Sequence, residues 1–253
     1  MNAESKLLSL RQKIEDSGCQ VCCIQETKKD HFDLSDIRKF APKNLDSFAF
    51  APSNGASGGI LIVWSSRVFV RTVVEVNFFS VTIDFISRHS AQNWTLTCIY
   101  GPCSGPERAN FVSWFRNVQI ADKKNWLFLS DFNFYRSVQD RNKDGAAMND
   151  IFIFNDIISI LGLLEIPLKG RKFTWSNMQQ NPLLERLDWV FTSVSWTVDY
   201  PNTLVMPLTR NIPDHVPCVV KIDTKIPKSP IFRFENYWVE MDGFFILFRQ
   251  FGL

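Results

Sequence analysis

Apolar and polar residues along the first part of the chain follow a helical pattern and then a series of strand-like patterns. Leu7, Leu10 and Ile14 recur at helical spacing within residues 4–16, and Gly18 stands where a helix commonly ends. Apolar runs typical of strands follow at residues 20–26, 58–64, 68–76, 79–86 and 93–100. The pattern predicts an N-terminal helix and then a series of strands.

The second half of the chain predicts two more helices among short strands. Ser104 and Glu107 form an S-x-x-E pattern, which predicts a capping box at the start of a helix through "FVSWFRNV". In "WLFLSDFNFYRS", Leu127, Phe128 and Leu129 predict a strand that is buried on both faces. A second helix is predicted over residues 149–163, and short strands at 172–175, 185–191, 203–206 and 218–222.

Many short strands with few helices between them do not fit a repeating βαβ order. They predict an α+β fold in which two mostly antiparallel sheets pack face to face with helices outside, a four-layer α/β/β/α sandwich. Residues 1–225 are predicted to form one domain. From Lys225 onward prolines interrupt the strand rhythm, so residues 226–253 are predicted to be a linker or tail with a short helix in "MDGFFILFRQF".

Composition narrows the class of protein. Hydrophobic residues make up 45% of the chain, which excludes disorder, and a formal charge of +2 is too small to indicate nucleic-acid binding by itself. The six cysteines lack zinc-finger spacing, and those within apolar runs are interpreted as reduced core thiols of an intracellular protein. No signal peptide is recognised, and the apolar stretch containing Asn155 and Asp156 is too short to cross a membrane.

The candidate chemistry lies where polar side chains end strands. Asp131 and Asn133 follow the buried strand, and their pattern fits either an ordinary turn or a carboxylate and an amide that handle a metal or a phosphate. Other polar residues stand at similar places: Glu26, Tyr100, Asp188, Asp214 and His215. Carboxylates gathered at strand ends repel one another unless a cation lies among them, and oxygen ligands of this kind suit Mg²⁺ or Mn²⁺.

Each of these residues also has a structural interpretation. Glu26 could pair with Lys28 or Lys29, and Asp188 could pair with Arg186. Tyr100 could be a core aromatic residue with its hydroxyl satisfied, and a single buried histidine is more often structural than catalytic. The ordered set, rather than any one member, favours a site.

Six motifs occur in an order that resembles a known superfamily. "IQETK", "IYGP", "SDFN", "FTW", "RLDWVF" and "DHVP" follow one another as in the endonuclease/exonuclease/phosphatase superfamily, the fold of apurinic/apyrimidinic endonucleases and pancreatic DNase. Over about residues 3–223 the chain most resembles the endonuclease domain of plant LINE-type (non-LTR) retrotransposons, and the tail resembles the segment joining that domain to the reverse transcriptase. The resemblance implies Mg²⁺- or Mn²⁺-dependent phosphodiester hydrolysis of DNA by a monomer without a small-molecule cofactor, in the nucleus rather than the cytoplasm.

The resemblance also implies a role for each residue. Glu26 would be the main metal ligand, with Asp214 near the metal or a second cation. Asp131 would orient or deprotonate the attacking water. The remaining roles concern the phosphate: Asn133 would hold an oxygen, Tyr100 would donate a hydrogen bond, His215 would stabilise the pentacovalent state with its tautomer fixed by Asp188, and Thr174 would contact DNA.

Three departures from the family pattern lead us to expect impaired cleavage. The W-N-x-R-G strand that opens the family is not found before "MNAESKLL", so the first strand and its asparagine are expected to be missing. Pro213 replaces a serine before Asp214, and Ser130 replaces a glycine before Asp131. Two alternatives stay open: a catalytically dead retroelement relic that at most binds nucleic acid or protein, and a phosphoesterase acting on phospholipids or inositol phosphates.

Overall fold

The computed structural model describes residues 3–55, 57–90, 92–209 and 214–222. The helices are α1 (Ala3–Ser17), α2 (Leu34–Phe40), α3 (Glu107–Arg116), α4 (Met148–Ile160), α5 (Val194–Asp199) and the 3₁₀ turn η1 (Val138–Asp140). The strands are β1 (Val21–Gln25), β2 (Ser47–Asn54), β3 (Ser57–Trp64), β4 (Phe69–Val76), β5 (Ser80–Ser87), β6 (Asn93–Tyr100), β7 (Trp126–Asp131), β8 (Leu164–Glu165), β9 (Trp175–Ser176), β10 (Leu184–Glu185), β11 (Asp188–Thr192), β12 (Leu204–Pro207) and β13 (Cys218–Lys221).

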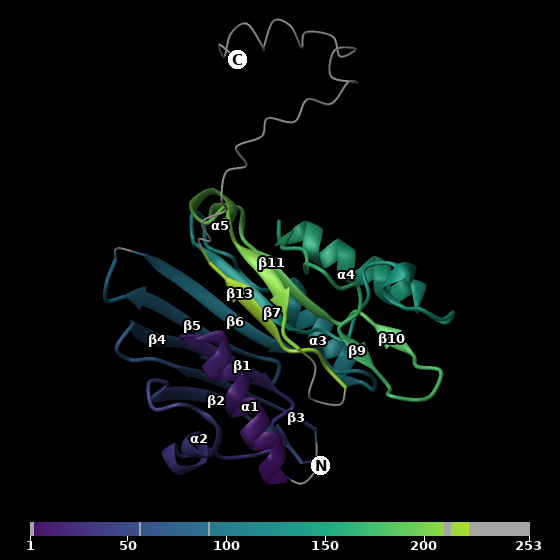
Figure 1. Ribbon diagram of the computed structural model, residues 1–253. Coiled ribbons are helices and arrows are strands. Elements are labelled where there is room, and N and C mark those ends of the chain that lie inside the picture. Colours follow the sequence, from purple (N-terminus) through teal and green to yellow (C-terminus); the bar gives the residue numbers. More distant parts are fainter. Residues whose placement is uncertain (1–2, 56, 91, 210–213, 223–253) are drawn as a thin grey trace, which may run out of the picture.

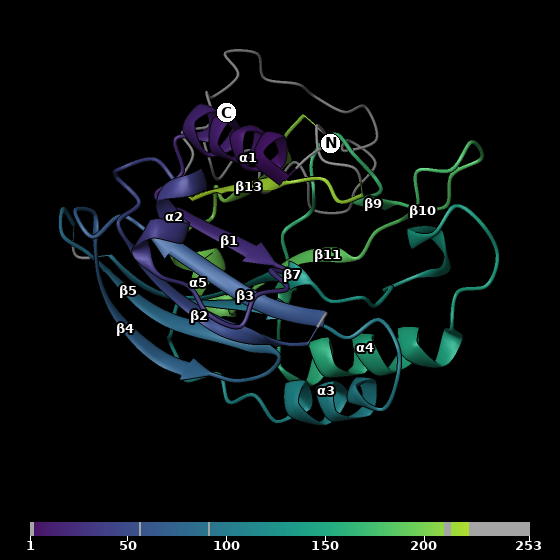
Figure 2. The same cartoon turned by 90° about the horizontal axis from the view of Figure 1, so that it is seen from below.

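Two main sheets pack face to face (Figure 1). The larger has the strand order β4-β5-β6-β7-β11-β8, and the smaller has the order β1-β3-β2. Their strand pairs are antiparallel except β6 and β7, which run parallel. Figure 2 shows α1 and α2 outside the smaller sheet and α3 and α4 outside the larger one. The predicted four-layer α+β sandwich is confirmed.

The buried strand predicted around Leu127 explains how the layers hold together. Leu127 packs in the core between the two sheets, whereas its neighbour Phe128 packs in the core under α3 and α4. Successive strand residues point to opposite faces, so a strand covered on both faces needs apolar residues at every position. The continuous apolar run is therefore required by the place of β7 in the middle of the sandwich.

The strands β12 and β13 form a separate two-stranded sheet beside the smaller one. Within the described residues β1 pairs only with β3, so its other edge has no strand partner. Val21 of β1 and Val220 of β13 pack against the same inter-sheet core. The strands β1 and β13 thus cover the same core, but no strand hydrogen bonds join them in the described part of the chain.

Most predicted elements are confirmed to within a few residues, but the capping box is wrong. Helix α3 begins at Glu107, Pro106 occupies the N-cap position, and no side chain caps the helix. Pro106 already has helical dihedral angles, and the Arg108 N–H donates to the Gly105 carbonyl, so the chain enters the helix through this turn and leaves Ser104 outside it.

Some features were not predicted, and one prediction cannot be compared. The elements α2, β2, η1, β8 and α5 were missed, and the single strand predicted at 185–191 is two strands, β10 and β11. The tail at residues 226–253, with its predicted helix, lies outside the described residues. In the part of the chain that the structure describes, no helix combines the length and apolar character needed to cross a membrane.

Candidate functional site

Three of the candidate side chains lie in one row across the larger sheet. Asp131 at the end of β7 is the register partner of Tyr100 at the end of β6 and of Asp188 at the start of β11. Residues that are opposite each other on neighbouring strands lie close together, so strand pairing alone gathers three residues that are far apart in the sequence. The row lies at the carboxyl ends of the parallel pair β6 and β7.

Asp131 and Asn133 form a tightly bonded corner just after β7. The Asn133 N–H donates to Asp131 Oδ1 at 3.0 Å, and Asn133 Nδ2 lies 3.2 Å from Asp131 Oδ2 and 2.7 Å from the Gly101 carbonyl. Asn133 has a positive φ of 55°, a conformation that is uncommon outside glycine and that clusters at functional sites. The corner is a turn, as one interpretation held, and it also fixes the buried carboxylate.

His215 lies between two carboxylates. Its Nδ1 is 3.0 Å from Asp188 Oδ2, and its Nε2 is 3.5 Å from Asp131 Oδ2. Arg186, the alternative partner considered for Asp188, instead donates to Glu165 at 2.6 Å. The imidazole thus joins β11 to the end of β7.

Tyr100 and Glu26 connect the two sheets at this end. The Tyr100 hydroxyl donates to Glu26 Oε1 at 2.5 Å. Glu26 follows β1, has a φ of 52°, and lies 3.7 Å from Lys28 Nζ through its other carboxylate oxygen. Both structural interpretations hold in part, because Tyr100 has its hydroxyl satisfied and Glu26 has a lysine nearby, yet the two side chains meet beside Asp131.

The pKa values of three site residues are raised above those of the same side chains in water. Burial and the nearby charge of Asp188 raise the pKa of Asp131 to about 7, although His215 acts in the opposite direction. Burial lowers the pKa of His215, but its hydrogen bond with Asp188 and the surrounding carboxylates outweigh this effect and raise the pKa to about 9. Burial and the bond to Glu26 raise the pKa of Tyr100 well above its usual range, so the phenol stays protonated.

The fit of these residues to a metal ion depends on how many ligands the ion needs from the protein. Within the described ranges, no group of three or more His, Cys, Asp or Glu side chains is arranged to hold a metal. The Glu26 side chain is 46% exposed, so its carboxylate can reach a hydrated ion. Mg²⁺ commonly uses one or two carboxylates together with water and phosphate oxygens. Burial and then the charge of Asp188 raise the pKa of Asp131, and a nearby cation would act in the opposite direction. The residues therefore fit a water-rich ion held mainly by Glu26.

The two remaining candidate residues lie beside the row. Asp214 is exposed, and its Oδ1 accepts the His215 N–H at 3.1 Å. Thr174 is only 1% exposed, and its hydroxyl accepts the N–H groups of Leu187 and Asp188 at 3.1 and 3.2 Å. The structure therefore brings all the candidate residues to one end of the sandwich, with Thr174 beneath the surface.

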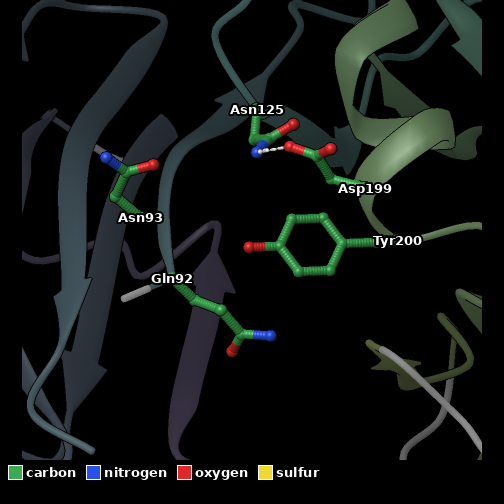
Figure 3. A pocket seen from close by; sticks show the side chains of 5 residues that line it. All are labelled: Gln92, Asn93, Asn125, Asp199 and Tyr200. Carbon is green, nitrogen blue, oxygen red and sulfur yellow. Dashed lines mark hydrogen bonds between the residues drawn. The ribbon is translucent and has the colours of Figure 1, made fainter. Parts of the chain in front are cut away.

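Two cavities differ in their relation to this site. A cavity of about 310 Å³ has Asn133 in its wall, together with charged residues that include Arg108, Asp150 and Glu185. A second cavity of about 330 Å³ is lined by Gln92, Asn93, Asn125, Asp199 and Tyr200 (Figure 3). Since Asn93 begins β6 and Asn125 immediately precedes β7, this second cavity lies at the opposite ends of the strands that carry Tyr100 and Asp131.

Sequence reasoning missed one residue that shapes the site. Gly101 donates its N–H to the Asp131 carbonyl at 2.9 Å and accepts from the Asn133 side chain. A Cβ at this position would lie 2.1 Å from the Phe132 carbonyl oxygen, so only glycine fits. The available signal was the glycine of "IYGP". That a side chain does not fit there follows only from the close approach of Phe132, which comes after β7.

Comparisons with known proteins agree with this geometry at the level of the fold. No protein-family model matches the chain, and no curated protein matches it. AP endonuclease LMAP from Leishmania major is 16% identical with a TM-score of 0.67, the match covering 85% of this chain and 83% of that one. The endonuclease domain of TRAS1, a telomere-specific non-LTR retrotransposon, is 15% identical with a TM-score of 0.62, covering 88% and 95%. An endonuclease/exonuclease/phosphatase family protein from Leptotrichia buccalis is 13% identical with a TM-score of 0.57, covering 88% and 95%. The chain therefore has the DNase-like sandwich fold of endonuclease/exonuclease/phosphatase proteins.

Proposed function

We propose that this protein hydrolyses phosphodiester bonds in DNA with the help of Mg²⁺ or Mn²⁺, as a retroelement-type endonuclease of the plant LINE kind whose cleavage is impaired. The observation that carries the proposal is the position of His215 between Asp188 and Asp131, with Nδ1 and Nε2 at 3.0 and 3.5 Å from their carboxylates. An imidazole and a carboxylate held side by side supply the proton transfers that hydrolysis needs.

Each residue of this arrangement has a defined task in the proposed reaction. Asp131, with a pKa of about 7, accepts a proton from the attacking water near neutral pH. His215, with a pKa of about 9, is a cation that stabilises charge on the phosphate oxygens, and Asp188 holds its ring in place. Tyr100 stays protonated and would turn its hydroxyl from Glu26 to the phosphate, while Asn133 orients Asp131 and would hold a phosphate oxygen.

A divalent cation would be held by Glu26, with Asp214 near it or near a second ion. When bound, such an ion neutralises charge on the phosphate and stabilises the leaving oxyanion. A polyanionic substrate is supported by the exposed Lys169, Arg171 and Lys172, which precede Thr174. Lys29 and Lys124 contribute less, since Lys29 pairs with Asp36 and Lys124 with Asp84.

Two observations support impaired cleavage. Ser130 is 5% exposed, and its hydroxyl finds no hydrogen-bond partner among the described residues, as expected of a side chain where the family has glycine. Glu26 follows β1, whose outer edge has no strand partner in the described chain, and His215 precedes β13, which lies in a separate two-stranded sheet. No strand hydrogen bonds join these two parts of the layer within the described residues. Loss of rigidity there would cost rate, because small displacements of reacting groups weaken catalysis.

Nicking of supercoiled plasmid tests the proposal. The protein should convert supercoiled to open-circular DNA slowly in Mg²⁺ or Mn²⁺ and not in chelator, and Asp131→Asn should reduce the rate by about 10²- to 10⁴-fold, the usual contribution of a positioned base. Asp122→Asn is the matched control, because Asp122 is exposed and precedes the start of β7, whereas Asp131 lies at its other end. Equal rates for Asp131→Asn and the parent protein would reject the proposed site.

The same assay, together with a DNA-binding measurement, tests whether cleavage is intact, impaired or lost. A parent rate equal to that of an active endonuclease of this fold would show that cleavage is not impaired. Binding of labelled duplex DNA with a steep salt dependence but no nicking would instead identify a relic that binds nucleic acid, because phosphate contacts release counterions.

A second candidate activity is hydrolysis of small phosphate esters. It is favoured by the 310 Å³ cavity beside Asn133, whose size and mixture of charged and apolar walls suit a small polar molecule. Release of nitrophenol from a phosphate monoester but not from a phosphate diester would favour this activity, and the reverse result would favour the nuclease.

A further inference from the structure

Thr174 occupies a connecting position between the two segments that carry Asp188 and His215. Its backbone N–H donates to the Glu185 carbonyl at 2.8 Å, and its carbonyl accepts the Val216 N–H at 2.8 Å. The next residue, Trp175, forms a bridge with His215. Thr174 is therefore held between β10 on one side and the approach to β13 on the other.

The side chain of Thr174 adds a second link, directed at Asp188. Its hydroxyl oxygen accepts the N–H of Leu187 at 3.1 Å and the N–H of Asp188 at 3.2 Å. The Leu187 carbonyl in turn accepts the Phe132 N–H at 3.0 Å, between Asp131 and Asn133. One buried hydroxyl thus fixes the backbone from which Asp188 projects and connects it to the corner that holds Asp131.

We propose that Thr174 is a positioning residue, which sets Asp188 against His215 through its buried hydroxyl and its backbone bonds to Val216, and that it does not contact the substrate. The inference rests on the proposed function and replaces the DNA contact expected from the resemblance. At 1% exposure the side chain has almost no surface to offer a ligand. Both lone pairs of its oxygen are used by the two N–H groups, since a hydroxyl accepts at most two hydrogen bonds.

The inference is tested with three variants. Thr174→Val keeps the shape of the side chain but removes the acceptor, whereas Thr174→Ser keeps the hydroxyl. Thr203→Val is the matched control: Thr203 is also buried, and its hydroxyl accepts from Trp196 Nε1 at 3.0 Å. It donates to the carbonyl of Tyr200, which lines the cavity at the opposite ends of the strands from the site. All three are compared with the parent protein.

The first readout is spectroscopic and does not require activity. The chain has only three histidines, so ¹⁵N-histidine labelling gives a simple spectrum in which the Nδ1–H of His215, hydrogen-bonded to Asp188, is the signal of interest. This signal should shift or disappear in Thr174→Val and persist in Thr174→Ser and Thr203→Val. An unchanged signal in a folded Thr174→Val would overturn the inference.

The second readout is kinetic. In plasmid nicking, kcat of Thr174→Val should fall by about 10- to 100-fold, the range typical of residues that orient a functional side chain, and Thr174→Ser should restore most of it. KM should change by less than about twofold, because positioning acts on the transition state. A rise in KM at constant kcat would instead show a direct DNA contact and overturn the inference.

A third measurement covers the case in which Thr174→Val does not fold. In the parent protein, the amides of Leu187 and Asp188 should be protected from hydrogen exchange, and exchange at unprotected rates would overturn the inference. If the parent protein nicks no DNA, the proposed function fails, while the histidine spectrum and the amide exchange still decide the role of Thr174.

Discussion

At the scale of single residues, Asp131 is subject to opposing influences. Burial, Asp188 and Glu26 raise its pKa, whereas His215 and the Asn133 N–H lower it, and the raising influences prevail. A carboxylate kept partly protonated near neutral pH is costly for the fold but useful as a base. Asp131 thus carries a cost in stability at a position where the proposed reaction would use it as a base.

Asp131→Asn should stabilise the protein at pH 8, and by less at pH 5, which lies between the unfolded and folded pKa values of the carboxyl group. The folded pKa of about 7 lies above the value of an unfolded aspartate, so ionisation at pH 8 destabilises the native state. Removing that charge should raise the free energy of unfolding at pH 8 by on the order of 1–3 kcal/mol. Urea denaturation at both pH values measures the effect, and a less stable variant at pH 8 would contradict it.

The nicking rate should pass through a maximum between about pH 7 and pH 9. Asp131 must be ionised to accept a proton, so the rate rises through its pKa of about 7; His215 must be protonated, so the rate falls through its pKa of about 9. A divalent cation stabilises the ionised carboxylate and should move the rising limb to lower pH. A pH–rate profile of the parent and of His215→Gln checks this, since the variant should lack the falling limb.

At the scale of elements, the site is a product of strand ends in register. Tyr100, Asp131 and Asp188 meet because β6, β7 and β11 are neighbours, and Gly101 allows the chain after β6 to pass close to Phe132. The strand pairs and the turn after β7 depend on each other, because Gly101 bonds both to Asp131 and to Asn133. A substitution where the chain after β6 passes Phe132 should therefore affect both stability and activity.

Gly101→Ala should lower the free energy of unfolding and the nicking rate together. The new Cβ would lie 2.1 Å from the Phe132 carbonyl oxygen, so the backbone must move, at a cost of about 1–3 kcal/mol. Gly162→Ala is the control: its φ of 61° disfavours alanine through backbone strain, but nothing lies within 4 Å of the added Cβ. Thermal unfolding and nicking of both variants should show loss of activity in Gly101→Ala alone.

At the scale of the whole molecule, aromatic residues hold the outer helices to the larger sheet. Phe154 of α4 lies 5.3 Å from the rings of both Phe132 and Phe134, between the helix layer and the strand ends. Phe132 stands between Asp131 and Asn133, so the packing of this layer also supports the corner of the site. The core under α3 and α4 is part of what keeps the site rigid.

Phe154→Ala should destabilise the protein by about 3–5 kcal/mol, because it leaves a cavity in a close-packed core. Phe152→Ala is the matched control on the same helix, since Phe152 is 66% exposed whereas Phe154 is 1% exposed. The control should change stability by less than about 0.5 kcal/mol. Chemical denaturation of both variants measures the difference, and equal effects would show that α4 is not anchored through Phe154.

The sequence by itself determined the elements with the strongest periodicity and the set of polar residues that end strands. A continuous short apolar run such as Leu127 to Leu129 is typical of a strand covered on both faces. The interruption of such runs by Asp131 and Asp188 marked functional candidates, because a polar group there must be satisfied by something. The capping box at Ser104 failed because a local pattern does not show that the chain enters α3 through Gly105 and Pro106.

Only the tertiary structure decided which of these residues meet. Strand register places Tyr100 and Asp188 on either side of Asp131, and the packing of the two sheets brings Glu26 within hydrogen-bond distance of Tyr100. The task of the Thr174 hydroxyl was equally hidden, because its partners are backbone N–H groups that no side-chain pattern reveals. Local sequence fixes periodicity, whereas contacts between distant segments depend on pairing and layer packing, which act across the whole fold.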